Sequence, residues 1–182
     1  MIAFTSKVLG LVALLALAAC APATRIESNR SASYTTQPTR VYVHTEIHPE
    51  WGNAFTAAFE RRLGTILKEC GAASQFGRID KLELNEKSRL DEMRKFGPDA
   101  VLTARHNGGT KDQYGKLILG IYDSRLADVK TGEIVWRASS TVSRGGITIE
   151  LAERGDAFAV ELSNKLKQDQ IFRTCPIIEL KK

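Results

Sequence analysis

The sequence lacks the short motifs that accompany the common catalytic and cofactor sites. It contains no Gly-x-Ser-x-Gly nucleophile elbow, no glycine-rich phosphate loop, no His-Glu-x-x-His zinc motif and no pair of Cys-x-x-Cys motifs. Histidine and cysteine are scarce, with three of each in 182 residues. The sequence therefore favours a non-enzymatic protein without a cofactor.

A concentrated cluster of basic residues is also missing. The chain has 26 lysine and arginine residues against 21 acidic residues, which gives a formal net charge of +5. The basic residues are scattered, with nothing longer than short pairs such as Arg61 and Arg62. Because nucleic-acid binding needs a basic patch or stripe, we expect no nucleic-acid partner.

No apolar run is long enough for a permanent transmembrane helix. The apolar run from Val8 to Ala19 has twelve residues, whereas a helix needs roughly 20 to cross a bilayer. Lys7 precedes the run, and a basic residue followed by a short apolar segment is typical of a secretory signal peptide. We expect this segment to direct export.

The run ends in Leu17, Ala18, Ala19 and Cys20, which resembles the lipobox of bacterial lipoproteins. This resemblance implies that 1–19 is a lipoprotein signal peptide and that Cys20 becomes the acylated first residue. Acyl chains such as palmitate would hold the protein on a membrane. Ala21, rather than an aspartate, follows the cysteine. By resemblance to proteobacterial sorting signals, this favours the periplasmic face of the outer membrane.

Residues 20–39 have few large apolar side chains and are rich in Ser, Thr, Ala and Pro. Such a segment cannot bury enough apolar surface to fold. It is predicted to be a flexible linker between the lipid anchor and a single α/β domain spanning 40–182.

Hydrophobic periodicity predicts the elements of this domain. Alternation of apolar and polar residues indicates strands, and apolar residues three or four positions apart indicate helices. The predicted elements are a strand at 40–47, a helix at 51–70, a strand at 78–84, a helix near 90–96, strands at 99–106, 116–128 and 133–143, and a helix at 149–172. This order favours a mixed sheet of four or five strands with about three helices packed on one face.

The hairpin segment YDSRLADVKTGEIVWRASSTV, centred on the Thr131–Gly132 turn, is similar to one found in a group of periplasmic proteins. The group comprises the curli-secretion lipoprotein CsgG, the penicillin-binding-protein activator LpoB and the amino-terminal domain of TolB. The segment PDAVLTARH also resembles a strand of these proteins. The resemblance implies the same order of elements over Arg40 to Phe172. It does not carry a function across, and Trp136 in the hairpin is predicted to be a core residue.

Several polar residues are candidates for a site. His44 and His48 share one face of the first predicted strand, so they are candidates to bind a metal together with His106. Asp123 and Arg125 are spaced to share a strand face and to bracket a partner's charges. The glycine-rich loop Asn107 to Gly115 is a candidate binding loop, and its alternative is a plain hairpin connection.

Cys70 and Cys175 are the cysteines that remain if Cys20 is acylated. Export places the chain where disulfides persist, and an even pair of cysteines in such a domain is usually bonded. We therefore predict a disulfide between them.

Together these features predict a non-enzymatic protein-binding or scaffolding module, with an envelope protein or the cell wall as its partner. One alternative is a metal-dependent enzyme that uses His44, His48 and His106. Another is an oligomeric lipoprotein of the secretion type. The sequence fixes neither the partner nor the oligomeric state.

Overall fold

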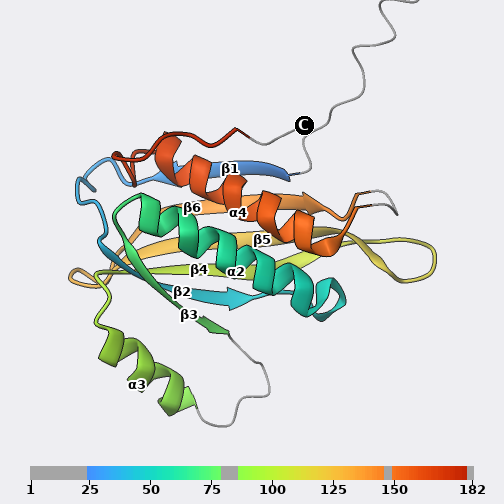
Figure 1. The fold of residues 1–182 in the computed structure, drawn as a ribbon, viewed down its shortest axis with the longest axis horizontal. Coiled ribbons are helices and arrows are strands. Elements are labelled where there is room, and N and C mark those ends of the chain that lie inside the picture. Colours follow the sequence, from blue (N-terminus) through green and yellow to red (C-terminus); the bar gives the residue numbers. More distant parts are fainter. Residues whose placement is uncertain (1–23, 79–85, 146–148, 180–182) are drawn as a thin grey trace, which may run out of the picture.

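A mixed β-sheet forms the centre of the structure, a computed structural model that describes residues 24–78, 86–145 and 149–179. The strands in these ranges are β1 (Thr24–Arg30), β2 (Arg40–Glu46), β3 (Ala73–Arg78), β4 (Ala100–Lys111), β5 (Leu117–Asp128) and β6 (Ile134–Ser143). They form a six-stranded sheet in the order β1-β6-β5-β4-β2-β3 (Figure 1). The predicted α/β class is confirmed, with more strands than the four or five expected.

The sheet combines two kinds of connection. β2 pairs in parallel with both β3 and β4, whereas β4, β5, β6 and β1 are antiparallel to one another. The parallel strands are joined through helices, and β4, β5 and β6 follow one another as hairpins, as their closeness in sequence allows.

β1 corrects the expectation of a flexible linker over 20–39. Its residues pair with β6 along the whole strand, from Thr24 opposite Val142 to Arg30 opposite Trp136. Tyr34, which follows β1, is 8% exposed and belongs to the core. The folded domain therefore begins before residue 40. The composition was misleading because an edge strand needs few large apolar residues, and Ile26 is the one that β1 packs against the core.

α2 (Gly52–Glu69) and α4 (Leu151–Gln168) lie side by side over one face of the sheet (Figure 1). A 3-10 turn, η2 (Pro49–Trp51), leads into α2, and Pro49 suits this first position because it needs no N–H donor there. α2 ends at Glu69 with Cys70 as its C-cap, and Gly71 follows with a φ of 79°, a conformation that glycine adopts readily. Both helices lie close to their predicted ranges.

Aromatic side chains fill the space between these helices and the sheet. The ring of Phe158 on α4 is centred 5.0 Å from that of Phe59 on α2 and 5.2 Å from that of Tyr122 on β5. Gly155 lets the two helices approach, because a Cβ atom there would collide with the carbonyl oxygen of Phe55. These contacts form the main core.

Trp136 is a core residue, as predicted, with 1% of its surface exposed. It lies opposite Leu126 on β5. Ile134, two residues earlier on β6, does not share the buried environment of Trp136, since it is 40% exposed. The register shifts between Leu126 and Ala127, and this irregularity turns Ile134 outward.

α3 (Glu86–Phe96) corrects the expectation that all helices pack on one face. Val43 and Thr45 of β2 point toward α2, where Thr45 donates a hydrogen bond to Glu60. Tyr42 and His44 therefore point to the opposite face. α3 contacts that face through Phe96, whose ring is 6.2 Å from that of Tyr42.

The strand predicted at 78–84 overlaps the described structure only at Arg78. The observed β3 covers Ala73–Arg78, and most of the predicted range lies in 79–85, outside the described residues. Gly77 in β3 faces Tyr42, whose side chain would collide with a Cβ atom at that position. Packing against β2 thus selects an earlier segment than the apolar pattern suggested.

The predicted signal peptide 1–19 and the predicted lipidation site Cys20 lie outside the described residues. Within the ranges that are described, no helix combines the length and apolar character needed to cross a bilayer.

Candidate functional site

The sheet face opposite α2 and α4 carries most of the candidate polar residues, and we call it the open face. Strand alternation and register define its members. They are Glu27 and Asn29 on β1, Arg137 and Ser139 on β6, Asp123 and Arg125 on β5, Thr103 and Arg105 on β4, and His44 and Glu46 on β2. α3 reaches this face only beside β2 and β3. A charged surface therefore extends across the rest of the sheet.

The open face is organised in two rows that run across the strands. One row contains the three acidic residues, in the order Glu27, Ser139, Asp123, Arg105 and Glu46. The neighbouring row has no acidic residue, in the order Asn29, Arg137, Arg125, Thr103 and His44. Directly opposite side chains in such rows lie within about 5 Å of one another at Cβ. The second row thus carries its positive charge at Arg125 and Arg137, in the centre of the open face.

Two carboxylates of the row that contains the acidic residues are bound by neighbouring side chains of the same protein. Arg105 forms an ion pair with Glu46, with 2.7 Å between Nε and Oε2. Asn107 donates a hydrogen bond of 2.7 Å from its amide to Asp123. The register shift between His106 and Gly109 accompanies this contact. These acidic groups are thus held by neighbouring residues.

Arg125 and Arg137 differ from Glu46 and Asp123 in lacking such partners among the described residues. They lie directly opposite each other on β5 and β6, and both are exposed. In the described part of the chain, neither has an ion pair or a side-chain hydrogen bond. Like charges opposed in this way repel each other, so a bound anion between them would be favourable. This arginine pair is the strongest candidate for partner recognition.

Two hollows adjoin at Arg125, and the smaller one also contacts Arg137. The larger, about 670 Å³, is lined by Thr103, Arg105, His106, Asn107, Gly108, Asp123 and Arg125. The smaller, about 380 Å³, is lined by Glu27, Ser28, Asn29, Asp123, Ser124, Arg125, Arg137, Ala138 and Ser139. Asp123 and Arg125 line both. The predicted role of these two residues in bracketing charges is therefore compatible with their position.

His44 lies at the β2 end of the row that contains Arg125 and Arg137, and it is half-buried. Its Nε2 is 3.2 Å from a guanidinium nitrogen of Arg89 on α3. Burial lowers the pKa of the imidazole, and the positive charge of Arg89 lowers it further. His44 is therefore neutral at neutral pH and is held between the sheet and α3.

The three candidate metal ligands His44, His48 and His106 do not converge in the structure. His48 and His106 do meet, with ring centroids 4.6 Å apart, and His106 packs against the ring of Tyr122. His44 lies on the other face of the sheet. Among the described residues, no group of three His, Cys, Asp or Glu is arranged to hold a metal ion. His48 does not share a sheet face with His44, because the chain leaves β2 at Glu46 and turns at η2.

The candidate loop Asn107 to Gly115 is largely part of a β-hairpin. β4 extends to Lys111, and β5 begins at Leu117. Tyr114 in the remaining turn is 84% exposed. The plain hairpin connection is therefore closer to the structure than a separate binding loop.

The predicted disulfide between Cys70 and Cys175 is present, with a Cα separation of 4.9 Å. Thr174 reinforces this link by donating a hydrogen bond to the carbonyl oxygen of Cys70. The pair joins the end of α2 to the segment after α4. It lies away from the open face.

Sequence reasoning found Asp123 and Arg125 but missed Arg105, Arg137 and the contribution of β1. Alternation in 134–143 marks Arg137 as outward-facing, so its strand face was readable. Its position opposite Arg125 was not, because register depends on the turn between β5 and β6.

No protein-family model and no curated protein sequence matches the chain. Solved structures with a similar fold include the PelC dodecamer from Paraburkholderia phytofirmans, with a TM-score of 0.44, 17% identity, and coverage of 76% of this chain and 94% of that one. They also include lipoprotein GNA1162 from Neisseria meningitidis, with a TM-score of 0.37, 16% identity, and coverage of 70% and 99%. A Xanthomonas campestris protein, XCC0632, has a TM-score of 0.39, 11% identity, and coverage of 79% and 87%. At these identities, the roles of those proteins are not transferred to this chain.

Proposed function

We propose that the chain is a lipid-anchored protein of the bacterial envelope that binds an acidic partner protein through its open face and catalyses no reaction. The observation that carries the proposal is the opposed pair Arg125 and Arg137. Their charges have no anionic partner within the described ranges. Carboxylates of a partner would form bidentate contacts with such guanidinium groups.

The proposed localisation of the protein rests on the sequence. The lipobox resemblance at Leu17 to Cys20 assigns lipidation, and Ala21 favours the outer membrane. The Cys70–Cys175 disulfide agrees with export, because disulfides persist in the periplasm and are rare in the cytosol. The resemblance to the group containing CsgG, LpoB and TolB agrees with an envelope role but names no partner.

Charge reversal tests the binding surface. The variant R125E/R137E should lose the partner that the wild-type protein retains when it is crosslinked in its native cells and analysed by mass spectrometry. Lys68→Glu is the control for a charge reversal elsewhere on the surface. Lys68 is exposed on α2, and α2 covers the sheet face opposite the open face. Unchanged crosslinks in the folded double variant would refute the role of the open face.

The alternative of a metal-dependent enzyme is tested separately. Elemental analysis of the purified protein should find no stoichiometric zinc or other transition metal. A stoichiometric metal would contradict this part of the proposal and would direct attention to residues outside the described ranges.

A further inference from the structure

The register of the sheet places the start of β1 at the same end as the β4–β5 hairpin. Thr24 pairs with Val142, which pairs with Gly120, which in turn pairs with Gly109. The chain runs from Thr24 into the sheet, so the described part of the chain begins at this end. The hairpin turn projects from the same end (Figure 1).

The distance from this end to the proposed lipid anchor is short. Cys20 and Thr24 are four residues apart, and four residues span at most about 14 Å when fully extended. The domain was expected to hang on a tether of nineteen residues after Cys20. With β1 in the sheet, the sequence leaves only Ala21, Pro22 and Ala23 between Cys20 and the first described strand. An anchored domain must then keep this end near the bilayer.

The β4–β5 hairpin extends beyond the position level with Thr24 by a distance comparable to the reach from Thr24 to Cys20. From Gly109 to the turn at Asp112–Gly115 the chain advances about 3 to 4 residues, which is roughly 10 to 14 Å at the rise of a β-strand. The hairpin tip therefore reaches as far from the sheet as the extended tether allows the anchor to reach.

The base of the hairpin is held in place by η2. Glu50 accepts a hydrogen bond from the backbone N–H of Leu117 at 2.7 Å and forms an ion pair of 3.0 Å with Lys111. The backbone hydrogen bond and then Lys111 lower the pKa of the Glu50 carboxyl, so it stays charged. The direction of the hairpin is thus fixed relative to the domain.

The tip presents an aromatic and a basic side chain. Asp112 shapes the turn by accepting hydrogen bonds of 2.9 Å from the backbone N–H groups of Tyr114 and Lys116. Tyr114 is 84% exposed, and Lys116 is also exposed. Tyrosine prefers the boundary between acyl chains and headgroups, and lysine is attracted to anionic headgroups. Lys111 is paired to Glu50, and Asp112 keeps its negative charge inside the turn, so Lys116 is the exposed cation of the tip that can meet an anionic headgroup.

We propose that the tip of the β4–β5 hairpin, with Tyr114 and Lys116, contacts the headgroup region of the anionic bilayer that holds the acyl chains of Cys20. This inference rests on the proposed lipidation. Anchor and hairpin together form two contacts that orient the strands away from the membrane. The open face then points sideways, where a partner can reach it.

The test uses the full-length lipidated protein in vesicles of phosphatidylethanolamine and phosphatidylglycerol with brominated acyl chains, which quench tryptophan. Tyr114→Trp should show quenched and blue-shifted emission above the wild-type background. That background is low because Trp51 and Trp136 are at most 1% exposed. Removing phosphatidylglycerol should weaken the quenching.

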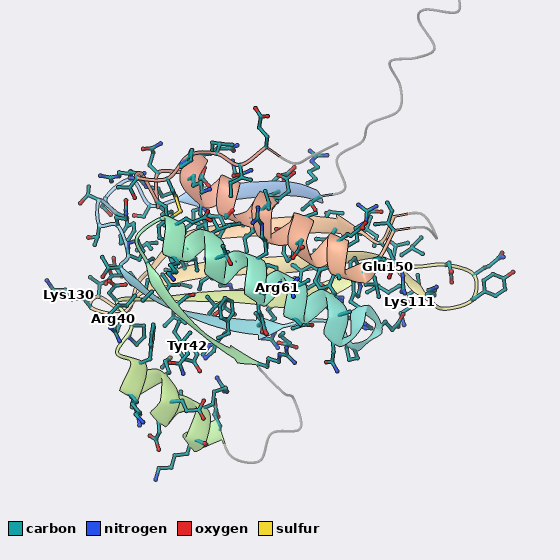
Figure 2. All side chains as sticks on the ribbon, viewed as in Figure 1. Arg40, Tyr42, Arg61, Lys111, Lys130 and Glu150 are labelled. Carbon is teal, nitrogen blue, oxygen red and sulfur yellow. A yellow bond between two sulfur atoms is a disulfide. The ribbon has the colours of Figure 1, made fainter. Side chains whose placement is uncertain are left out.

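Two control variants report other orientations. Val129→Trp places the probe in the β5–β6 turn, at the far end of a strand of about 40 Å. The neighbouring Lys130 and the hairpin residue Lys111 lie at opposite ends of the molecule in Figure 2. Ser139→Trp places the probe on the open face. Both should remain unquenched.

The outcomes separate this inference from the proposed function. If the protein carries acyl mass but the probe at 114 is not quenched, or if the probe at 129 or 139 is quenched as strongly, the orientation is wrong and the anchor stands. If wild-type protein carries no acyl mass and Cys20→Ser does not change its membrane fraction, both proposals fall.

Discussion

Trp136 on β6 donates its indole N–H to Oδ2 of Asp169, at the end of α4, over 2.7 Å. The same oxygen accepts a hydrogen bond from Ser28 on β1, and Oδ1 is 3.5 Å from Lys165. A single carboxylate thus joins the edge strand, its neighbour and the last helix.

Replacing Asp169 with alanine should destabilise the fold by about 2 to 4 kcal/mol. The buried indole N–H of Trp136 would lose its acceptor, and Ser28 would lose its link to the helix. Urea denaturation measures this change. Asp91→Ala is the control, because Asp91 pairs with Arg94 in an exposed ion pair on α3 and its loss should cost less than about 1 kcal/mol. Equal losses for the two variants would contradict the joining role of Asp169.

Trp136→Ala should cost roughly 3 to 5 kcal/mol, since it leaves a large cavity between the sheet and α4. Ile134→Ala, on the same strand but 40% exposed, should cost much less. Guanidinium denaturation compares them. In the wild-type protein, weak quenching of tryptophan emission by acrylamide is expected, because Trp51 and Trp136 are both buried. Strong quenching would show that one of these indoles is accessible.

A chain that starts at Arg40 should be substantially less stable than one that starts at Thr24. The truncation removes the seven paired positions of β1, leaves the edge of β6 open and uncovers core surface around Tyr34. We expect a loss of roughly 3 kcal/mol or more, equivalent to a melting temperature lower by about 6 to 12 °C. Equal melting temperatures would restore the linker interpretation of 24–39.

Reduction of the Cys70–Cys175 bond should lower the free energy of unfolding by at most about 4 to 5 kcal/mol. The bond closes a loop with a sequence separation of 105 residues, and the loss comes mainly from the freedom regained by the unfolded chain. Denaturation with and without dithiothreitol measures it. The variant C70A/C175A should show no response to dithiothreitol, and any response in it would reveal a different origin of the effect.

His44 should make stability fall as the solution becomes acidic. Burial and then Arg89 lower its pKa below the usual 6.5 in the folded chain. Above that pH neither state binds the proton, so His44 contributes no slope. Below about pH 6.5 the unfolded chain takes up the proton first, and the free energy of unfolding decreases.

The variant His44→Gln should show a shallower decrease of stability below pH 6.5 than the wild-type protein. An NMR titration of the His44 ring gives the second readout, and Arg89→Gln should raise its titration midpoint toward the usual value. A wild-type midpoint at or above 6.5 would contradict this prediction.

Much of the fold was readable from the sequence where each element carries a strong pattern of its own. β2 alternates, and Phe55, Phe59 and Leu63 recur at helical spacing along α2. β5 and β6 alternate on either side of a Thr131–Gly132 turn. The Cys70–Cys175 pairing followed from the expected compartment and the even number of cysteines, without any knowledge of distance.

The remaining features depend on contacts between distant segments. β1 has one large inward apolar residue, Ile26. The residues of β6 that pair with β1 lie more than a hundred positions later in the sequence. The side of the sheet that α3 takes is set by Phe96 meeting Tyr42, which no local periodicity encodes. The arginine pair depends on the register between β5 and β6, and the separation of His44 from His106 depends on which sheet face each strand position takes.

The pairing of β1 with β6 also constrains the order of folding. Thr24 pairs with Val142, so among the described strands the first in sequence can join the sheet only after the last has formed. The β4–β5 and β5–β6 hairpins, by contrast, close short loops and can form early. Until β6 is in place, the amino-terminal segment has no native strand to join, and completion of the sheet edge is a late step in which the two ends of the domain come together.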